Sequence, residues 1–140
     1  MPAVPPQRVD EALAGWIAAY PVPVVVVIHA NHPNEIDDTV IRGLGALEAA
    51  GATLLNQAVL LRGVNDSAEV LEALSKRLFD CGVLPYYLHL LDRVSGAAHF
   101  EVGEDRALEI MDHLRARLPG YLVPRLVREI EGAPSKTAVD

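Results

Sequence analysis

Hydrophobic residues follow two alternating patterns along the chain, one with helical spacing and one continuous. Residues 9–20 place apolar side chains near one face of a helix, which Pro21 and Pro23 then end. Residues 24–29 (VVVVIH) are a continuous and largely β-branched run. Such a run is typical of a strand that is buried on both faces, as in a parallel sheet.

The two patterns continue to alternate towards the end of the chain. Asp37 or Asp38 is expected to cap the next helix, and Gly51 is expected to end it. Pro124 marks the last predicted strand as an edge strand or an irregular one. In total, further helices are predicted at 36–51, 67–82 and 104–120, and further strands at 53–61, 83–91 and 121–130.

The order of these elements predicts the fold class. Strands that alternate with helices through short loops indicate right-handed βαβ units with parallel strands. The first three strands start about 30 residues apart, as they do in a (β/α) barrel, but a closed barrel needs more strands. We therefore predict an α/β fold in which residues 1–130 form part of a (β/α) barrel and residues 131–140 form a C-terminal tail.

Composition narrows the class of protein. Hydrophobic residues make up 51% of the chain and charged residues 22%, which indicates a globular domain. The net charge of −7 argues against nucleic acid or an anionic membrane as a partner, because both need a basic surface. The longest apolar run, 22–28, is too short to cross a bilayer. The single cysteine, Cys81, allows no internal disulfide and cannot alone hold an iron–sulfur cluster, so a cytoplasmic setting is expected.

Polar side chains gather at the predicted strands and the loops that follow them, where parallel α/β folds bind their ligands. His29, His32 and Glu35 are residue types that bind metals, but such residues more often cap loops, and we assign no metal ligand to this chain. Asn56 and Gln57 interrupt the second strand, either as hydrogen-bonded core amides or as ligand contacts.

Three further features of the sequence provide candidate site residues. Asp92 follows the third strand and either caps a loop or faces a ligand. Tyr86 and Tyr87 are neighbours in a strand, so they are expected to point to opposite faces. Lys136, in the run GAPSK, is either a solvated residue of the tail or an amine held near a carbonyl group.

Four long segments together resemble the lysine 2,3-aminomutase family of radical S-adenosylmethionine (SAM) enzymes. The resemblance runs from about Pro5 to the end of the chain. The ending EGAPSKT is similar to the branch that makes (R)-β-lysine for the modification of elongation factor P. The segments are HANHPNEID (29–37), LLNQAVLLRGVND (54–66), PYYLHLLDRVSGAAHF (85–100) and GYLVPRLVREI (120–130), followed by the closing lysine.

This resemblance implies a fold, cofactors and residue roles. The implied fold is the C-terminal half of a radical SAM TIM-like barrel. Lys136 corresponds to the lysine that binds pyridoxal 5′-phosphate (PLP) as an aldimine. Asp92 and Glu129 correspond to two acidic residues that hold the side-chain ammonium of the substrate L-lysine. His29 and Gln57 correspond to contacts of SAM, which a [4Fe–4S] cluster cleaves to a 5′-deoxyadenosyl radical during the isomerisation to (R)-β-lysine.

The chain departs from the family in one respect that bears on its activity. The family's cluster motif is CxxxCxxC, and Cys81 lies in no such motif. We therefore expect a C-terminal fragment that is inactive alone, completed by a separate N-terminal half or by self-association through the open barrel edge. Two further hypotheses are a non-catalytic α/β binding module and a structural half-barrel subunit.

Overall fold

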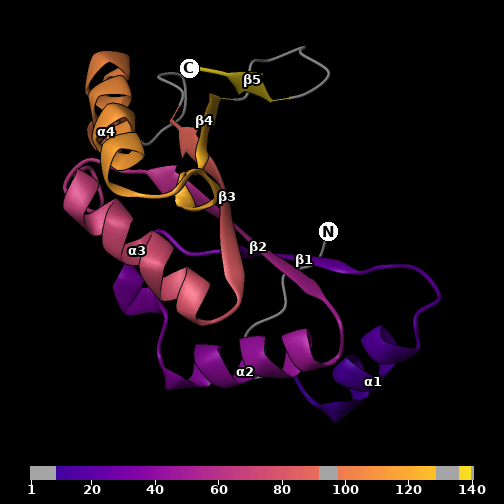
Figure 1. Ribbon diagram of the computed structural model, residues 1–140. Coiled ribbons are helices and arrows are strands. Elements are labelled where there is room, and N and C mark those ends of the chain that lie inside the picture. The colour runs from indigo at the N-terminus through magenta and orange to yellow at the C-terminus, as the bar shows by residue number, and fades with distance from the viewer. Residues whose placement is uncertain (1–8, 92–97, 129–135, 140) are drawn as a thin grey trace.

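A computed structural model describes residues 9–91, 98–128 and 136–139 as a mixed α/β fold (Figure 1). Its helices are α1 (Glu11–Ala19), α2 (Asp38–Ala49), α3 (Ala68–Asp80) and α4 (Glu104–Arg117). Its strands are β1 (Val25–His29), β2 (Thr53–Leu60), β3 (Val83–Leu90), β4 (Arg125–Arg128) and β5 (Thr137–Ala138). Short 3₁₀ turns are η2 (Pro33–Glu35), η3 (Ala98–Phe100) and η4 (Gly120–Leu122). Every helix and strand that the sequence predicts corresponds to one of these elements.

The five strands form one sheet in the order β1-β2-β3-β4-β5. Strands β1 to β4 are parallel to one another, and β5 is antiparallel to β4. Parallel strands in sequential order are what successive right-handed βαβ units produce, so the predicted parallel α/β fold is confirmed. The barrel stays a prediction, because the described strands form an open sheet (Figure 1).

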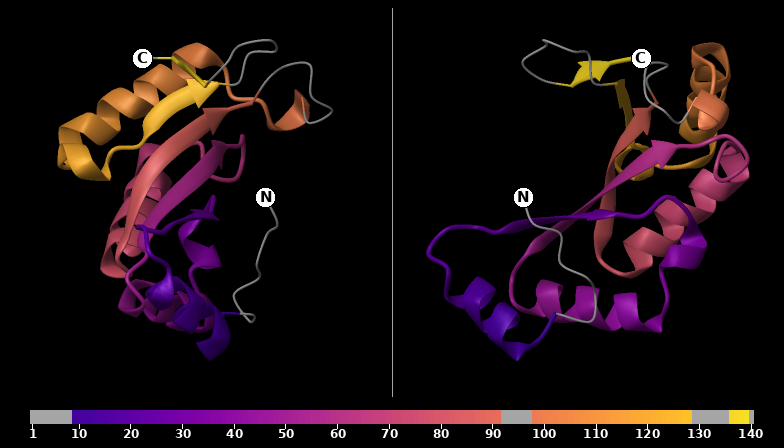
Figure 2. Two further views of the ribbon diagram at one scale, coloured as in Figure 1. Left: turned by 90° about the vertical axis from the view of Figure 1, so that its right-hand side faces the viewer. Right: turned by 180° about the vertical axis from the view of Figure 1, so that it is seen from behind.

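Helices α2, α3 and α4 lie on one side of the sheet, and the hydrophobic core fills the space between them and the strands (Figure 2). Side chains on β2 show the division, because Leu54 and Leu60 are buried beneath the helices while Leu55 and Val59 are only partly buried on the other side. We call this other side of the sheet the open face. The helices contribute Leu44, Leu47, Leu71, Leu74, Leu78, Ile110, Met111 and Leu114 to the core.

The ends of α2 follow the predicted signals. The side chain of Asp37 accepts a hydrogen bond from the backbone N–H of Val40 at 2.9 Å, which confirms Asp37 as the cap. Gly51 follows the last turn with a φ of 98°, a left-handed conformation that glycine adopts without a steric penalty. These local signals place β2 directly after the helix and so fix where the second strand enters the sheet.

Two predictions about the strands are corrected by the structure. β1 is not buried on both faces, because Val25 is 54% exposed and Val27 is 39% exposed on the open face, which no second layer covers in the described residues. The last parallel strand begins only at Arg125, because Gly120–Leu122 form a turn and Pro124 has no N–H to donate to the sheet. No helix within the described ranges is long and apolar enough to span a bilayer.

Candidate functional site

Four side chains form a row across the open face, one from each parallel strand. The register pairs His29 with Gln57, Gln57 with Tyr87, and Tyr87 with Arg125. Residues paired in this way point to the same side of a sheet. We call His29, Gln57, Tyr87 and Arg125 the central row. Residues next to them in sequence are buried on the helix side, namely Asn56, Leu88 and Leu126.

Lys136 reaches the central row from the end of the chain. β5 pairs with β4, and the backbone N–H of Val139 donates to the carbonyl of Leu126 at 2.9 Å. Through this pairing Lys136 is partly buried, and its Nζ lies 5.4 Å from the centroid of the Tyr87 ring. An ammonium at this distance is attracted to the face of the ring by about 0.5–2 kcal/mol. The side-chain amine of Lys136 is therefore held against the sheet.

The structure thus brings three predicted site residues, His29, Gln57 and Lys136, to one face of the sheet. It does not test their predicted roles. Asp92 and Glu129 lie outside the described residues, so their predicted contacts with a substrate ammonium stay predictions. Neither Tyr87, the ring beneath the amine, nor Arg125 could be assigned to the site from the sequence, because both assignments depend on the register between strands.

The neighbours Tyr86 and Tyr87 lie on the same face, so the prediction that they point to opposite faces is wrong. The register between β2 and β3 shifts here, because Gln57 pairs with Tyr87 while the preceding residue of β2 pairs with Pro85. Tyr86 is therefore an extra, unpaired residue, and the two ring centroids are 4.3 Å apart. A hydrogen bond with Tyr87 raises the pKa of the Tyr86 hydroxyl above its ordinary value, while the positive charge of Arg125 opposes the rise.

Asn56 and Gln57 have different surroundings. Asn56 is 2% exposed on the helix side, where its Nδ2 donates to the carbonyl of Ala30 at 3.1 Å and its Oδ1 accepts from the N–H of Ala30 at 2.9 Å. Of the two interpretations that the sequence allowed for Asn56, the hydrogen-bonded core amide is confirmed. Gln57 lies on the open face, where its amide can reach a ligand.

A second buried amide, Asn65, organises the loops beyond β1 and β2. Its Nδ2 donates to the carbonyls of Asn31 and Val59 at 2.7 and 2.9 Å, and its Oδ1 accepts from the N–H of Leu61 at 2.8 Å. Asn65 is fully buried, and the side chain of Asn31 returns a contact by accepting from the N–H of Val59 at 2.9 Å. The carboxyl ends of these two strands are therefore fixed relative to each other.

His32 and Glu35 cap η2. The Nδ1 of His32 accepts from the backbone N–H of Asn34 at 3.1 Å, and the carboxylate of Glu35 accepts from the backbone N–H groups of Asn31 and His32. This is the capping interpretation of the His and Glu residues after the first strand. No group of three potential metal ligands comes together in the part of the chain that the structure describes.

Cys81 lies at the other end of the strands from these loops. It follows α3 directly and precedes β3, so it is near the amino end of that strand. The thiol is partly buried, and burial raises its pKa, so the reactive thiolate is disfavoured. Cys81 is therefore not positioned or activated to take part in chemistry at the central row.

A hollow of about 360 Å³ lies beside β4 and is lined by residues of α4, η4, β4 and β5. Of the central row it touches only Arg125. Its other lining residues are mainly apolar, and the hollow does not contain the Lys136 amine. We therefore place the candidate site on the open face, where an amine, a guanidinium, an imidazole and an amide share one face of the sheet with the rings of Tyr86 and Tyr87. An amine there can bond to a carbonyl carbon, and a guanidinium can hold an anion.

No family model matches the chain. Along its whole length it is 52% identical to an L-lysine 2,3-aminomutase of Escherichia coli K12, and it spans 41% of that protein. It is 49% identical over 137 residues to an L-lysine 2,3-aminomutase of Haemophilus influenzae, of which it spans 40%. It is 40% identical over 138 residues to one of Clostridium subterminale, of which it spans 33%. The chain thus spans 33–41% of the length of these curated relatives.

Proposed function

Because the chain belongs to the L-lysine 2,3-aminomutase family along its whole length, we propose that it supplies one part of such an isomerase's active site. This part binds PLP and the substrate L-lysine and contacts SAM. The proposed reaction of the complete protein is the conversion of L-lysine to (R)-β-lysine. The similarity of the ending EGAPSKT to one branch of the family supports a role in modifying elongation factor P.

The observation that carries this proposal is the position of Lys136. Its Nζ lies above the Tyr87 ring, on the same face as His29 and Gln57. A lysine that reacts with an aldehyde needs an amine held at a ligand site, whereas a lysine in a solvated tail would be free to move. Four residues distant in sequence meet on one face here, and each is of a type that the proposed cofactors require.

The residues on the open face fit PLP. Lys136 offers the amine that bonds to the aldehyde carbon, and the Tyr87 ring offers a flat apolar surface against which a planar ring can lie. When bound, PLP holds the substrate amino group and supplies an electron-accepting ring that supports its migration. His29 and Gln57 are proposed to contact SAM, with hydrogen bonds that fix its orientation.

Asp92 and Glu129 complete the proposed site by analogy with the family. Two carboxylates select a long cationic substrate through charge-assisted hydrogen bonds, each worth about 1.5–3 kcal/mol when shielded from water. An iron–sulfur cluster does not fit this chain, because Cys81 is its single cysteine and such clusters are held by several thiolates. We therefore propose that the cluster ligands lie in the part of its relatives' sequences that this chain does not match. We also propose that the chain alone is inactive.

The exposure of the open face favours a partner over an isolated binding module. Val25, Val27 and Leu84 are 54%, 39% and 38% exposed, and within the described residues β1 has no neighbour on its outer edge. Apolar side chains and an unpaired strand edge are features that a further strand and layer would cover. We propose that the remaining part of a family member covers this face, and that self-association is the weaker alternative.

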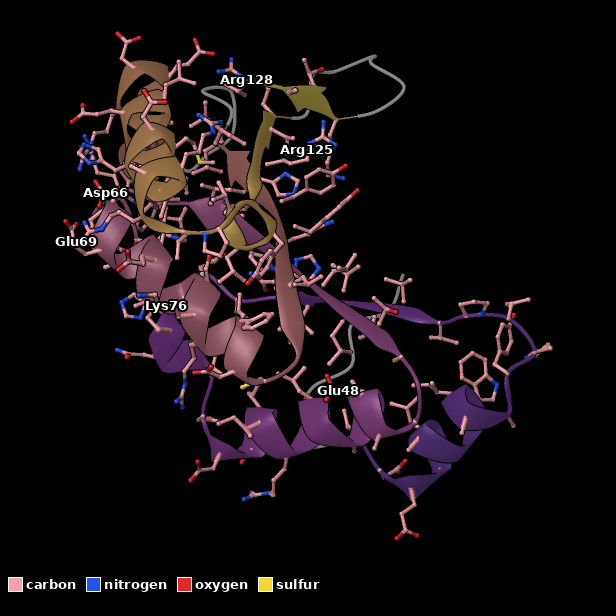
Figure 3. All side chains as sticks on the ribbon, viewed as in Figure 1. Glu48, Asp66, Glu69, Lys76, Arg125 and Arg128 are labelled. Carbon is pink, nitrogen blue, oxygen red and sulfur yellow. The ribbon has the colours of Figure 1, made fainter. Side chains whose placement is uncertain are left out.

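Reductive trapping tests the proposed site. The chain has two lysines, and Lys76 is a matched control because it lies on the helix side, paired with Glu72 at 3.7 Å (Figure 3). After incubation with PLP and reduction with borohydride, we expect peptide mapping to find the added mass mainly on Lys136. Lys76→Arg should leave the labelling unchanged, and Lys136→Arg should remove it. Equal labelling of the two lysines in the wild-type chain would argue against a PLP site.

A further inference from the structure

Arg125 is a cation on the open face of the sheet. It is the β4 member of the central row, paired in register with Tyr87, and its side chain is exposed. Among the described residues it makes no hydrogen bond and no ion pair. Arg128, on the same strand, differs, because it binds Glu104 at 3.2 Å (Figure 3). An unpaired guanidinium beside a candidate site is available to an incoming anion.

Arg125 and Lys136 both lie beside the paired rings of Tyr86 and Tyr87. Lys136 Nζ lies 5.4 Å from the Tyr87 centroid, and the Tyr86 centroid is 4.3 Å from that of Tyr87. Arg125 is paired in register with Tyr87 on the neighbouring strand, so it lies beside the same rings. Two cations therefore approach one aromatic surface in a chain whose net charge is −7. Two neighbouring cations on one surface favour an anionic ligand.

The two cations differ in the chemistry they can perform. Guanidinium donors form a rigid planar fork that matches two oxygens of a phosphate, and the group stays charged at any ordinary pH. The amine of Lys136 can lose its proton and bond to a carbonyl carbon. A ligand with a planar ring, an aldehyde and a phosphate would place one group on each cation and its ring over the tyrosines.

We propose that Arg125 holds the phosphate of the aldehyde that reacts with Lys136. This inference rests on the proposed function, because it assigns the anion contact of the same site. In the covalent step the Nζ of Lys136 attacks the aldehyde carbon, a C=N bond forms, and the carbonyl oxygen leaves as water. Arg125 takes no part in bond formation. It is a binding residue that keeps the aldehyde within reach of the amine.

Comparing two aldehydes tests this role. The wild-type chain, Arg125→Gln and the control Arg128→Gln are each titrated with PLP, trapped with borohydride and mapped by mass spectrometry. We expect the PLP concentration for half-maximal labelling of Lys136 to rise at least about tenfold in Arg125→Gln, because a charge-assisted contact is lost. Arg128→Gln should match the wild type. Pyridoxal, which lacks the phosphate, should label the wild type and Arg125→Gln at equal concentrations.

The outcomes separate this inference from the proposed function. If PLP labels Lys136 equally well in the wild type and in Arg125→Gln, the role of Arg125 is wrong while the PLP site stands. If PLP does not label Lys136 in the wild type, the proposed site itself is wrong. Arg125→Lys keeps the charge without the fork and should give an intermediate midpoint. Thermal melts of all variants show whether each is folded, and a pyridoxal midpoint that rises as much as the PLP midpoint would also overturn the inference.

Discussion

(R)-β-Lysine is expected to form when the chain is co-expressed with the part of the Escherichia coli relative that it does not match, and not when the chain is expressed alone. The chain spans 41% of that relative and contains a single cysteine, so the added part would have to supply the ligands of the proposed cluster. The added part should also cover the apolar open face. Product is measured by mass spectrometry after incubation with L-lysine, SAM, PLP and a reductant under anaerobic conditions.

In this reconstituted protein Lys136→Ala should reduce turnover by about a thousandfold or more, because it removes the amine that we propose bonds to the cofactor. Lys76→Ala is the matched control, since the Lys76 side chain is 60% exposed on α3 and its ion pair with Glu72 lies at the surface. It should retain the wild-type rate. A Lys136→Ala protein that turned over as fast as the wild type would contradict the assigned role. Product formation by the isolated chain would contradict its proposed inactivity.

Among the substitutions proposed here, those at Asn65 should lower the free energy of unfolding most. Its fully buried amide satisfies three backbone groups, at 2.7, 2.8 and 2.9 Å. Asn65→Ala removes this partner from three partly buried backbone groups, and we expect the free energy of unfolding to fall by about 2–4 kcal/mol. Urea denaturation followed by circular dichroism measures the change. The loops beyond β1 and β2 should loosen as well.

Asn65→Asp sharpens the test. Its ionised carboxylate would face the carbonyl oxygens of Asn31 and Val59 in place of the donor, so the loss should exceed that of Asn65→Ala at neutral pH. Burial raises the pKa of such a carboxyl, so part of the stability should return as the pH is lowered and the group takes up a proton. Asn34→Ala, at an exposed position of η2, should change stability by less than about 0.5 kcal/mol. Equal losses at positions 34 and 65 would contradict this account.

Periodicity was sufficient to predict the parallel sheet, because each strand and helix carries its own local signal. The run Val24–His29 is too apolar and β-branched for a loop, and Asp37 and Gly51 bound the next helix by capping chemistry alone. Burial of β1 on both faces was wrongly predicted for a different reason. Exposure depends on which layer covers a strand, and no second layer is present on the open face of the described residues.

The candidate site was predictable only in part. His29 and Gln57 were assigned to the site through the family resemblance, and the observed register then places them on one face. Tyr87 could not be placed, because the extra residue Tyr86 shifts the alternation of β3, and Pro85 was the one hint of an irregularity. β5 has two residues and no periodic pattern, so its pairing with β4 could not be seen. The position of the Lys136 amine over the Tyr87 ring depends on that pairing.

The central claim is that the Lys136 amine is held over the Tyr87 ring on the open face. Solution NMR of the intact chain tests it most directly, through nuclear Overhauser effects between the ε-methylene protons of Lys136 and the ring protons of Tyr87. We predict clear cross-peaks and an upfield ring-current shift of those methylene protons, both lost in Tyr87→Ala. Random-coil shifts for the Lys136 side chain, with no cross-peak to the ring, would contradict the claim.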